Sequence, residues 1–442
     1  MNIYALSSGR GPSGIAIIRL SGKNILKILE IITKKKKIKI KEANFCKFYN
    51  PLNNDLIDEG LLLWFPRPNS FTGEDLAEFH IHGSNAVISC FLNVLSLQDK
   101  CRLAEPGEFT KTAFYNNKID LIAAESIGDL IHSETELQRQ QAVKLAQGSA
   151  SKYYNDLREK LIKSLAYIEA KIDFGEEDLP SSVLQEVQKS VKSVHADIKS
   201  ILATQKIGEK IRDGFRVSII GEVNAGKSSL LNLLAKRDVA IISEQKGTTR
   251  DVIETHLNID GYPVILADTA GIRDSKNEVE KQGIALAINK SKDADLNLIM
   301  IDNSSKKIDE KIRNLINQNS IIVLNKSDIN DTQNHKFNDL ETVLVSVKNN
   351  SNIELLVKKI KENLSKKFIT SDNILVTRQR HKDNLNACLK EIDNFLKKDQ
   401  NKDIEMAAED LRLATRHLGS IVGKVDVEEI LGSIFNDFCI GK

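Results

Sequence analysis

Hydrophobic positions in the first half of the chain follow two different patterns. Residues 1–118 combine short apolar runs with turns, which predicts an α+β domain. GIAIIRL, GLLLWF and AEFHIHG have the pattern of strands, and NAVISCFLNVLSL has the length of a helix. From about residue 120 to 210 the apolar residues recur at helical spacing. One such stripe consists of Leu157, Leu161, Ile162, Leu165, Ile168 and Ile172.

Residues 214–368 alternate strand-like and helix-like segments, which predicts a doubly wound α/β domain. Helical spacing returns after residue 370, where one face carries Leu385, Leu389, Ile392 and Phe395. An α/β domain between two helical stretches predicts an insertion. The expected multidomain fold has an N-terminal α+β domain (1–118), a helical bundle in two parts (119–213 and 369–442) and the inserted α/β domain (214–368).

Length and charge limit the expected number of domains and the expected contacts with nucleic acid. A length of 442 residues suggests about three domains. The formal net charge of +2 creates no overall field that would draw the chain onto nucleic acid. The basic run KKKKIKIK (34–41) is either an RNA patch or a solvated connecting loop, and the loop is favoured because runs of one sign are commonly exposed.

The five cysteines form no CxxC pair, which argues against zinc and against a disulfide framework. No apolar run approaches the roughly 18 residues of a membrane span. The N-terminal MNIYALSSGRGPSG lacks the features of a signal peptide. We therefore expect a cytoplasmic protein without stable membrane insertion.

The segment GEVNAGKS (221–228) matches the phosphate-binding pattern G-x-x-x-x-G-K-[ST] and lies between a strand-like and a helix-like segment. Its glycines allow backbone N–H groups to face phosphates. Lys227 reaches the β- and γ-oxygens, and the Ser228 hydroxyl is a ligand for Mg²⁺. The predicted phosphate-binding residues are Asn224, Ala225, Gly226, Lys227, Ser228 and Ser229.

Two further segments follow in the order that a GTPase requires. GTTR (247–250) offers Thr249 as a second magnesium ligand. DTAG (268–271) offers Asp268 to the metal through water and its glycine N–H to the γ-phosphate. The residues predicted to bind GTP in this part of the chain are Ser243, Glu244, Gln245, Lys246, Gly247, Thr248, Thr249, Asp268, Thr269, Ala270 and Gly271.

The next two segments select the base. In NKSD (325–328), Asp328 can accept hydrogen bonds from the guanine N1 and amino groups, which adenine lacks. SVKNN (346–350) is expected to place backbone amides near the guanine O6. The ordered set of segments predicts a GTP site. Its base-binding residues are predicted to be Asn325, Lys326, Asp328, Ser346, Val347 and Lys348.

Ile272 follows DTAG, where a hydrolysing switch protein usually carries glutamine, and its side chain can neither donate nor accept a hydrogen bond. Either hydrolysis is inefficient or catalytic help comes from elsewhere. The Asn224 side-chain oxygen can hold a monovalent cation beside the phosphates, together with carbonyls of SEQKGTTR (243–250). The acids that can act on the attacking water are Asp274, Glu278 and Glu280.

Motifs distributed over nearly the whole chain resemble the MnmE (TrmE) family of tRNA-modification GTPases. They are GRGPSGIAIIRLSG (9–22), PNSFTGEDLAEFHIHG (68–83), AEPGEFTKTAFYNNKIDL (104–121), GEVNAGKSSLLN (221–232), GTTRD (247–251), DTAGIR (268–273) and FCIGK (438–442). The resemblance implies a G domain that dimerises through its switch regions and uses K⁺ where other GTPases use an arginine finger, which would explain Ile272.

By the same resemblance, K⁺ is bound by Asn224, Ser243, Gln245 and Thr248, and Mg²⁺ by Ser228 and Thr249. The catalytic residues are then Glu280, which positions the water, Lys227 and Thr249. One departure is that Gln245 and Lys246 stand where the family often has a small apolar pair. Backbone ligation tolerates this change, whereas the Lys246 charge is able to alter the potassium dependence.

The N-terminal domain resembles a folate-binding fold. The resemblance implies that Arg19, Glu78, Lys118 and Lys442 hold 5-formyl- or 5,10-methylene-tetrahydrofolate. His80 and His82 alternate onto one strand face and could mimic a metal pair, but a structural role is favoured. Cys439 lies in the FCIGK tail, where both a nucleophilic and a structural role stay open.

The implied function is that of a homodimer joined through its N-terminal domains. With the FAD-dependent partner MnmG (GidA), in a heterotetramer or larger complex, it adds an aminomethyl or carboxymethylaminomethyl group to C5 of the tRNA wobble uridine. Two rival functions remain. One is a regulatory GTPase of ribosome assembly, and the other is a folate-dependent aminomethyltransferase with an accessory G domain.

Overall fold

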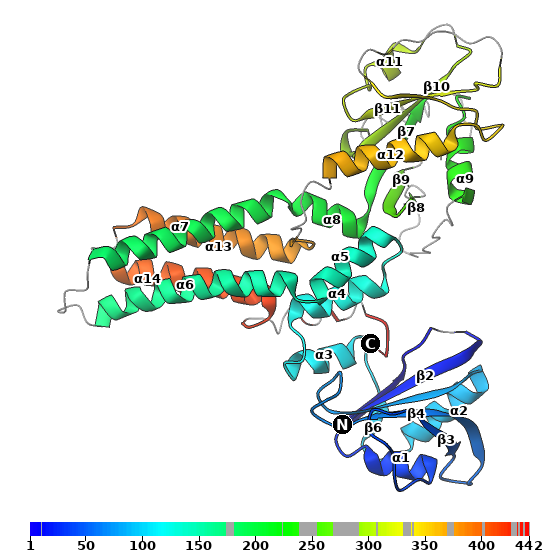
Figure 1. Cartoon of the computed structure of the whole chain (residues 1–442), viewed down its shortest axis with the longest axis vertical. Coiled ribbons are helices and arrows are strands. Elements are labelled where there is room, and N and C mark those ends of the chain that lie inside the picture. The colour runs from blue at the N-terminus through cyan, green and yellow to red at the C-terminus, as the bar shows by residue number, and fades with distance from the viewer. Residues whose placement is uncertain are drawn as a thin grey trace, which may run out of the picture. The chain divides into compact units, whose positions relative to one another are not determined.

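The computed structural model describes the chain except residues 10, 174–180, 223, 238–253, 268–290, 306–307, 330–336, 338–339, 369–374, 400–402, 426–430, 432–433, 436–437 and 442. The described residues form two compact units (Figure 1). Unit 1 comprises Met1–Gly128, Leu145–Lys163 and Leu411–Lys442, and unit 2 comprises Asp129–Lys144 and Ser164–Asp410.

Unit 1 contains a sheet with the strand order β3-β4-β5-β2-β1-β6. Its neighbouring strands are antiparallel except for β1 and β6, which are parallel. The helices α1 and α2 cover one face, where aromatic and aliphatic side chains of strands and helices form a buried core. These elements are β1 (Asn2–Leu6), β2 (Ser13–Gly22), α1 (Leu26–Thr33), β3 (Asn44–Tyr49), β4 (Leu56–Phe65), β5 (Asp75–Gly83), α2 (Asn85–Ser96) and β6 (Cys101–Leu103).

The basic run 34–41 connects α1 to β3. Lys34 caps α1 with a left-handed backbone conformation, and the run forms no regular element apart from a bridge between Ile40 and Trp64. The lysines of the run are exposed. The connecting loop favoured from the sequence is therefore the observed structure.

A series of helices follows the N-terminal sheet in the chain and precedes the α/β region. The described helices are α3 (Glu108–Tyr115), α4 (Leu121–Ile131), α5 (Glu136–Ala146), α6 (Ser149–Asp173), α7 (Ser181–Ala203) and α8 (Gln205–Asp213). In unit 1, the C-terminal residues Leu431, Phe435 and Phe438 pack against Leu121 and Ala124 of α4. The tail therefore belongs to the same core as the residues that follow the N-terminal domain.

Unit 2 contains the doubly wound sheet, with the strand order β12-β11-β10-β7-β9-β8. All neighbours are parallel except β8 and β9. Alternate residues of β10 enter separate cores on the two faces, as Leu298 and Ile299 do. The elements are β7 (Phe215–Gly221), α9 (Lys227–Arg237), β8 (Glu254–Ile259), β9 (Tyr262–Ala267), β10 (Leu296–Asp302), α11 (Glu310–Arg313), β11 (Ser320–Asn325), β12 (Thr342–Leu344) and α12 (Ile353–Phe368).

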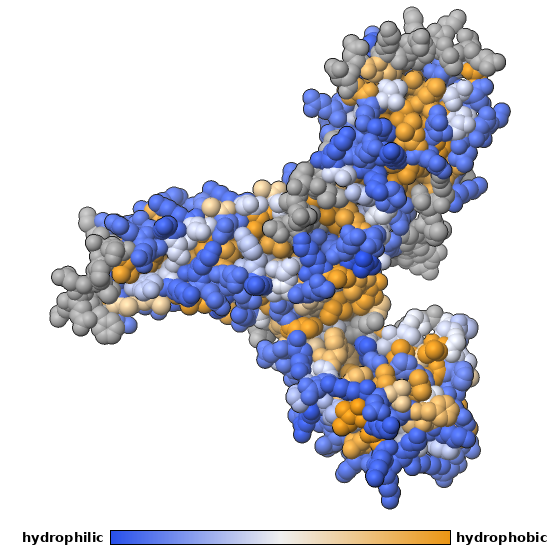
Figure 2. All heavy atoms as spheres, viewed as in Figure 1, coloured by the Kyte–Doolittle hydropathy of each residue, from blue (hydrophilic) through white to orange (hydrophobic). Residues whose placement is uncertain are grey.

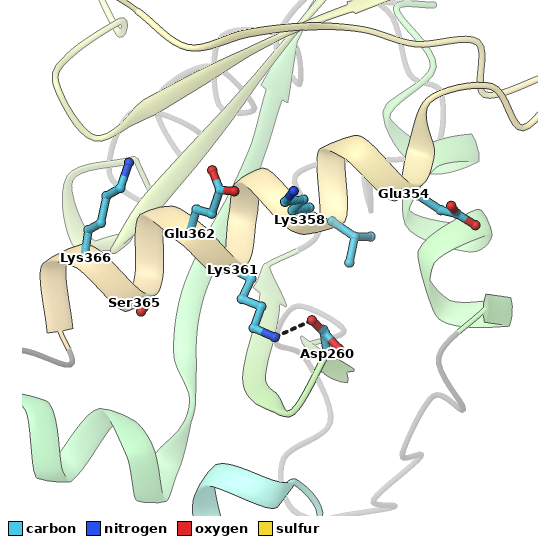
Figure 3. A pocket seen from close by; sticks show the side chains of 8 residues that line it. Asp260, Glu354, Lys358, Lys361, Glu362, Ser365 and Lys366 are labelled. Carbon is cyan, nitrogen blue, oxygen red and sulfur yellow. Dashed lines mark hydrogen bonds and ion pairs between the residues drawn. The ribbon is translucent and has the colours of Figure 1, made fainter.

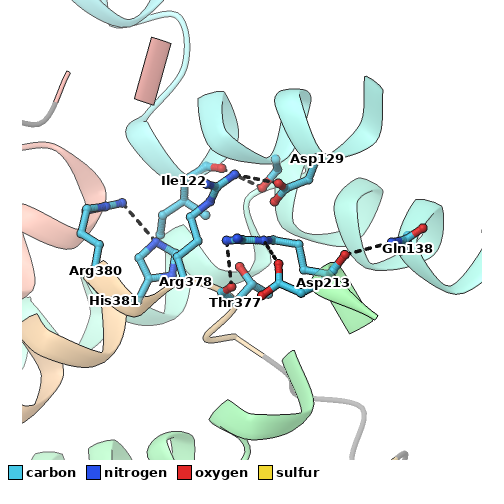
Figure 4. Close-up of polar contacts among 10 residues, drawn as sticks. Ile122, Asp129, Gln138, Asp213, Thr377, Arg378, Arg380 and His381 are labelled. Carbon is cyan, nitrogen blue, oxygen red and sulfur yellow. Dashed lines mark hydrogen bonds and ion pairs between the residues drawn. The ribbon is translucent and has the colours of Figure 1, made fainter. Parts of the chain in front are cut away.

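The chain returns to helical structure in α13 (Gln379–Lys397) and α14 (Ile404–Val422). Arg212, near the end of α8, donates from Nη1 to the Thr377 carbonyl at 3.3 Å, so the points where the chain enters and leaves the α/β region are adjacent (Figure 4). Arg378 pairs with Asp129 at 2.6 Å beside them. The α/β region is thus inserted between helical segments, as the sequence predicts.

The predicted helical stripes are correct in their main positions and wrong at one residue. In α6, Leu157, Leu161 and Ile168 are buried, but Ile162 is 36% exposed because it follows Leu161 by one residue and points to another side. In α13, Leu385, Ile392 and Phe395 are buried, and Leu389 is partly buried beside the buried Cys388.

The visible surface of both units is mainly hydrophilic, with apolar residues exposed in patches (Figure 2). Among the described residues, no helix has the length and apolar character needed to cross a membrane.

Candidate functional site

The GEVNAGKS segment turns sharply between β7 and α9. Asn224 has a φ of 62° and Gly226 a φ of 99°. A Cβ atom on Gly226 would lie 2.4 Å from Asn325 Nδ2, so both conformation and space require glycine. The turn delivers the chain to the N-terminus of α9, whose first N–H groups lack acceptors within the helix. This is the backbone arrangement that phosphate groups need.

Lys227 begins α9 and its side chain folds back over the preceding loop. Its Nζ donates to the carbonyl oxygens of Gly221 at 2.9 Å and Glu222 at 2.7 Å. Ser228 and Ser229 follow in the first turn of the helix and are exposed. The ammonium group and the Ser228 hydroxyl are therefore both at the end of α9 that receives the loop.

Asn325 joins three of the predicted segments. It ends β11 and is 4% exposed. Its Nδ2 donates to the Ala225 carbonyl at 2.8 Å, and its Oδ1 accepts from the Val347 N–H at 3.1 Å. The phosphate loop, NKSD and SVKNN are thus held together by one buried carboxamide.

Asp328 is exposed, and its Oδ1 accepts a hydrogen bond from Ser346 Oγ at 2.6 Å. This hydrogen bond lowers the pKa of the Asp328 carboxyl below its usual value. The group is therefore an acceptor-only carboxylate at neutral pH. A carboxylate that is held by Ser346 can accept hydrogen bonds from two adjacent N–H groups of a base.

Asp302 also shapes this region, although it is not among the predicted site residues. It ends β10 and forms an ion pair with Lys326. Burial by itself raises the pKa of the Asp302 carboxyl, but hydrogen bonds from Lys326 and Ser304 outweigh burial and lower it. The sequence could have identified Asp302 as a site residue, because it ends the apolar strand LNLIMID. Ligand-binding side chains gather at the carboxyl ends of parallel strands.

Several predicted residues lie outside the part of the chain that the structure describes. They are the segment from Ser243 to Thr249, the DTAG residues Asp268, Thr269, Ala270 and Gly271, the candidate acids Asp274, Glu278 and Glu280, and Lys442. Their roles stay predictions.

A shallow cavity of about 640 Å³ lies along α12, beside the turn between β8 and β9 (Figure 3). Lysines and acids alternate around it, and Lys361 pairs with Asp260 of the turn. None of the predicted GTP-binding residues is among the residues that line it. Because its charges are mixed, the cavity has no marked preference for an anion.

Arg19 and Glu78 face each other in unit 1. They are register partners on β2 and β5, and Arg19 Nε lies 2.8 Å from Glu78 Oε1. The Arg19 guanidinium is 6.0 Å from the centre of the Phe71 ring. Lys118 is exposed, and a Cβ atom built on Gly73, two residues after Phe71, would lie 3.2 Å from Lys118 Cε. The loop that carries Phe71 and Gly73 therefore lies next to Arg19 on one side and to Lys118 on the other.

The C-terminal tail contacts the residue that directly follows strand β1. Ser7 Oγ donates to the Gly441 carbonyl at 2.7 Å, and Ile440 forms a bridge with Pro106. Cys439 is exposed and its carbonyl accepts from the Gly107 N–H at 3.4 Å. The tail is thus fixed by its backbone, which leaves the role of the Cys439 thiol open.

The two histidines of HIHG have separate carboxylate neighbours. His82 Nδ1 lies 2.8 Å from Asp58, and His80 Nε2 lies 3.7 Å from Glu78. Among the residues that the structure describes, no group of three or more His, Cys, Asp or Glu side chains is arranged to hold a metal ion.

Asn325→Ala should lower the stability of the α/β domain and weaken nucleotide binding. The substitution leaves the buried Ala225 carbonyl and the Val347 N–H without their partner, and each such loss costs about 1–3 kcal/mol. Calorimetry should show an earlier transition of the α/β domain. The fluorescence transition of Trp64, the single tryptophan, should stay in place because this residue lies in β4. Asn314→Ala, at an exposed position, is the control, and equal behaviour of the two variants contradicts the bridging role.

Comparison with known proteins covers the whole chain. The family model for the "GTP-binding protein TrmE N-terminus" matches residues 2–118, and the model for the "MnmE helical domain" matches residues 121–439. The tRNA modification GTPase MnmE of Pelagibacter ubique is 58% identical, with 100% of both chains covered. The protein of the same name from Rickettsia bellii (strain RML369-C) is 43% identical, with 100% of this chain and 99% of the relative covered.

Among solved structures, the chain is similar to a single-residue variant of Aquifex aeolicus Era bound to GDP·AlF4⁻, with 29% identity, 40% of this chain and 66% of that chain covered, and a TM-score of 0.28. Two family models and full-length relatives thus match the N-terminal, helical and nucleotide-binding parts together. The chain therefore belongs to the MnmE (TrmE) family of tRNA modification GTPases and is an enzyme of the GTP-hydrolysing class.

Proposed function

We propose that the chain is a cytoplasmic, potassium-dependent GTPase whose homodimer works with the FAD-dependent MnmG on certain tRNAs. Together they add an aminomethyl or carboxymethylaminomethyl group to C5 of the wobble uridine, and the carbon comes from a tetrahydrofolate. The observation that carries the proposal is the 58% identity over the full length of a relative named tRNA modification GTPase. That identity includes an N-terminal domain that a nucleotide switch alone does not require.

In the proposed GTP site, Asp328 selects guanine and Asn325 holds the base-binding and phosphate-binding segments in register. Lys227 moves from the carbonyls of Gly221 and Glu222 to the phosphate oxygens when GTP binds. This exchange costs little free energy, because Lys227 gives up two carbonyl acceptors and gains phosphate oxygens. The phosphate oxygens are charged and therefore accept stronger hydrogen bonds. The N-terminus of α9 adds its N–H groups and the positive end of its dipole.

Two metal ions fit the donor set at this loop. The exposed Ser228 hydroxyl suits Mg²⁺, and the side-chain oxygen of the exposed Asn224 suits K⁺. Held by Ser228 and Asn224, such cations would supply positive charge where negative charge develops between the β- and γ-phosphates during hydrolysis. Thr248, Thr249 and Glu280 complete the proposed set as ligands and as the group that positions the water.

A reduced folate fits the residues around Arg19. Its pterin offers N–H donors to the Glu78 carboxylate, which Arg19 holds in place, and its glutamate tail is an anion that the exposed Lys118 ammonium can bind. His80 Nε2 supports the assignment, because this atom is buried beside Glu78 without a hydrogen-bond partner, as it would be in a site that a ligand completes. When bound, the folate supplies the one-carbon unit.

Deletion of the gene tests the proposal. Mass spectrometry of tRNA from such cells should show unmodified wobble uridine, and expression of the wild-type chain should restore the modification. Expression of Arg19→Ala should leave GTP hydrolysis intact and restore little modification, because the Glu78 pair and the proposed folate site are lost. Lys47→Ala, which breaks an exposed Lys–Glu pair on β3, is the matched control.

Two outcomes distinguish the rival functions. Retained wobble modification in cells without the gene favours a regulatory GTPase of ribosome assembly. One-carbon transfer by the purified chain without MnmG favours a folate-dependent aminomethyltransferase with an accessory G domain.

A further inference from the structure

The turn between β8 and β9 is a rigid two-residue loop. Asp260 and Gly261 have φ values of 50° and 91°, the pair of left-handed conformations that a tight hairpin requires. Ile259 and Tyr262 face each other across the strands, and the Gly261 N–H donates to Asn258 Oδ1 at 2.9 Å. The turn is therefore closed both by its backbone conformation and by a side-chain hydrogen bond.

This hairpin separates the two segments that carry the predicted switch residues. β8 begins five residues after Thr249, and Asp268 directly follows the end of β9. Each proposed switch segment is therefore directly continuous in sequence with one strand of the hairpin.

The first turn of α5 is docked on this hairpin. The Leu137 N–H donates to the Gly261 carbonyl at 3.1 Å. An N–H in the first turn of a helix has no acceptor within the helix, so the hairpin supplies one. The Leu137 side chain also packs against the core cluster that contains Leu257 and Val264 of the hairpin strands.

The same turn of α5 is fastened at a second point. Gln138 Nε2 donates to the Arg212 carbonyl at 2.9 Å (Figure 4). Arg212 lies two residues before Gly214, after which β7 leads directly to the phosphate loop. The start of α5 therefore contacts both the hairpin and the segment that precedes the phosphate loop.

We propose that Leu137 and Gln138 are positioning residues through which the hairpin transmits the nucleotide state of the G domain to the helical segment α5. The inference rests on the proposed GTPase function and adds a route for its regulation. In this route, a shift of the hairpin when GTP replaces GDP alters the Leu137–Gly261 hydrogen bond, while Gln138 keeps the first turn of α5 attached to the Arg212 carbonyl. The transmitted signal is a change in how firmly the start of α5 is held.

Hydrogen exchange of the full-length protein tests this route, with GDP compared with a non-hydrolysable GTP analogue in K⁺ and Mg²⁺. In the wild type, amides of α9 and of α5 should both exchange at different rates in the two states. The difference in α5 should be about fivefold or more, the lower end of usual coupling factors.

Leu137→Pro removes the N–H that donates to Gly261. A helix tolerates proline in its first turn, so α5 should persist. In this variant the nucleotide-dependent difference in α5 should disappear while that in α9 remains. Glu136→Pro is the matched control, because it places the same ring one residue earlier and leaves the Leu137 N–H in place. Leu137→Ala, which keeps the N–H but removes the packing, should reduce the difference in part, and it replaces the proline variant if that variant does not fold.

An α5 difference that survives in Leu137→Pro as fully as in Glu136→Pro overturns the inference. A wild type in which α9 responds to the analogue and α5 does not also overturns it, while leaving the proposed GTPase function in place. If the amides of α9 exchange at the same rate in both nucleotide states, the proposed nucleotide site is contradicted, and so is the proposed route.

Discussion

Asp328→Asn should exchange the nucleotide specificity of the protein from GTP to xanthosine triphosphate. In the wild type, the carboxylate accepts from the guanine N1 and amino groups, and the Ser346 hydrogen bond keeps it ionised and oriented. Two charge-assisted hydrogen bonds of about 1.5–3 kcal/mol each are lost in the variant. GTP affinity should fall by roughly 10²–10⁴-fold.

The affinity that the variant gains for the xanthine nucleotide also comes from hydrogen bonds between residue 328 and the base. Xanthine has a carbonyl at the position of the guanine amino group, and the asparagine NH₂ can donate to it while its oxygen accepts from N1–H. Titration of fluorescent GDP and XDP analogues measures both affinities. Ser327→Ala, which alters the neighbouring loop position without touching the carboxylate, is the control. Equal affinity of Asp328→Asn for both nucleotides contradicts the assignment of Asp328 to base recognition.

Asn224→Ala should remove the stimulation of GTP hydrolysis by K⁺ and have little effect on GDP binding. Asn224 has a left-handed backbone conformation within the phosphate loop, and the residue is exposed. Loss of one preorganised charge-stabilising group from an active site costs about 10²–10³ in rate. The rate of the variant in K⁺ should therefore approach that of the wild type in Na⁺.

Asn314→Ala provides the matched control, since it removes another exposed asparagine side chain that is not among the residues predicted to bind GTP or K⁺. A variant at position 224 that keeps the full stimulation contradicts the assignment of Asn224 as a potassium ligand. The departure at Gln245 and Lys246 makes this comparison informative, because a lysine charge beside the ion would weaken the stimulation in the wild type as well.

The α/β region was the most predictable part of the fold. Its central strands are buried on both faces, so they appear in the sequence as continuous apolar runs such as LNLIMID. β8 and β12 do not appear as continuous apolar runs. β8 is an edge strand with polar residues at alternate positions, and β12 has three residues. In the helices, the error at Ile162 arises because Leu161 and Ile162 are both apolar neighbours, and residue type alone does not tell which of them faces the core.

The candidate site was predictable in its residue types and less so in its connections. The pattern GEVNAGKS identifies Lys227 and Ser228, because a phosphate loop depends on local spacing. The bridge made by Asn325 depends on how closely Ala225 and Val347 approach, which no spacing in the sequence specifies. The same holds for Arg19 and Glu78, whose pairing follows from the register of β2 and β5.

The steady-state rate of GTP hydrolysis by the purified full-length protein, in KCl and in NaCl at equal ionic strength with saturating Mg²⁺, tests the central claim most directly. We expect the rate in KCl to exceed that in NaCl by at least about tenfold, because Na⁺ is too small for ligands spaced to hold K⁺ beside the phosphates. Equal rates in the two salts would show that no potassium ion substitutes for an arginine finger. A protein that hydrolyses no GTP in either salt would contradict the whole mechanism.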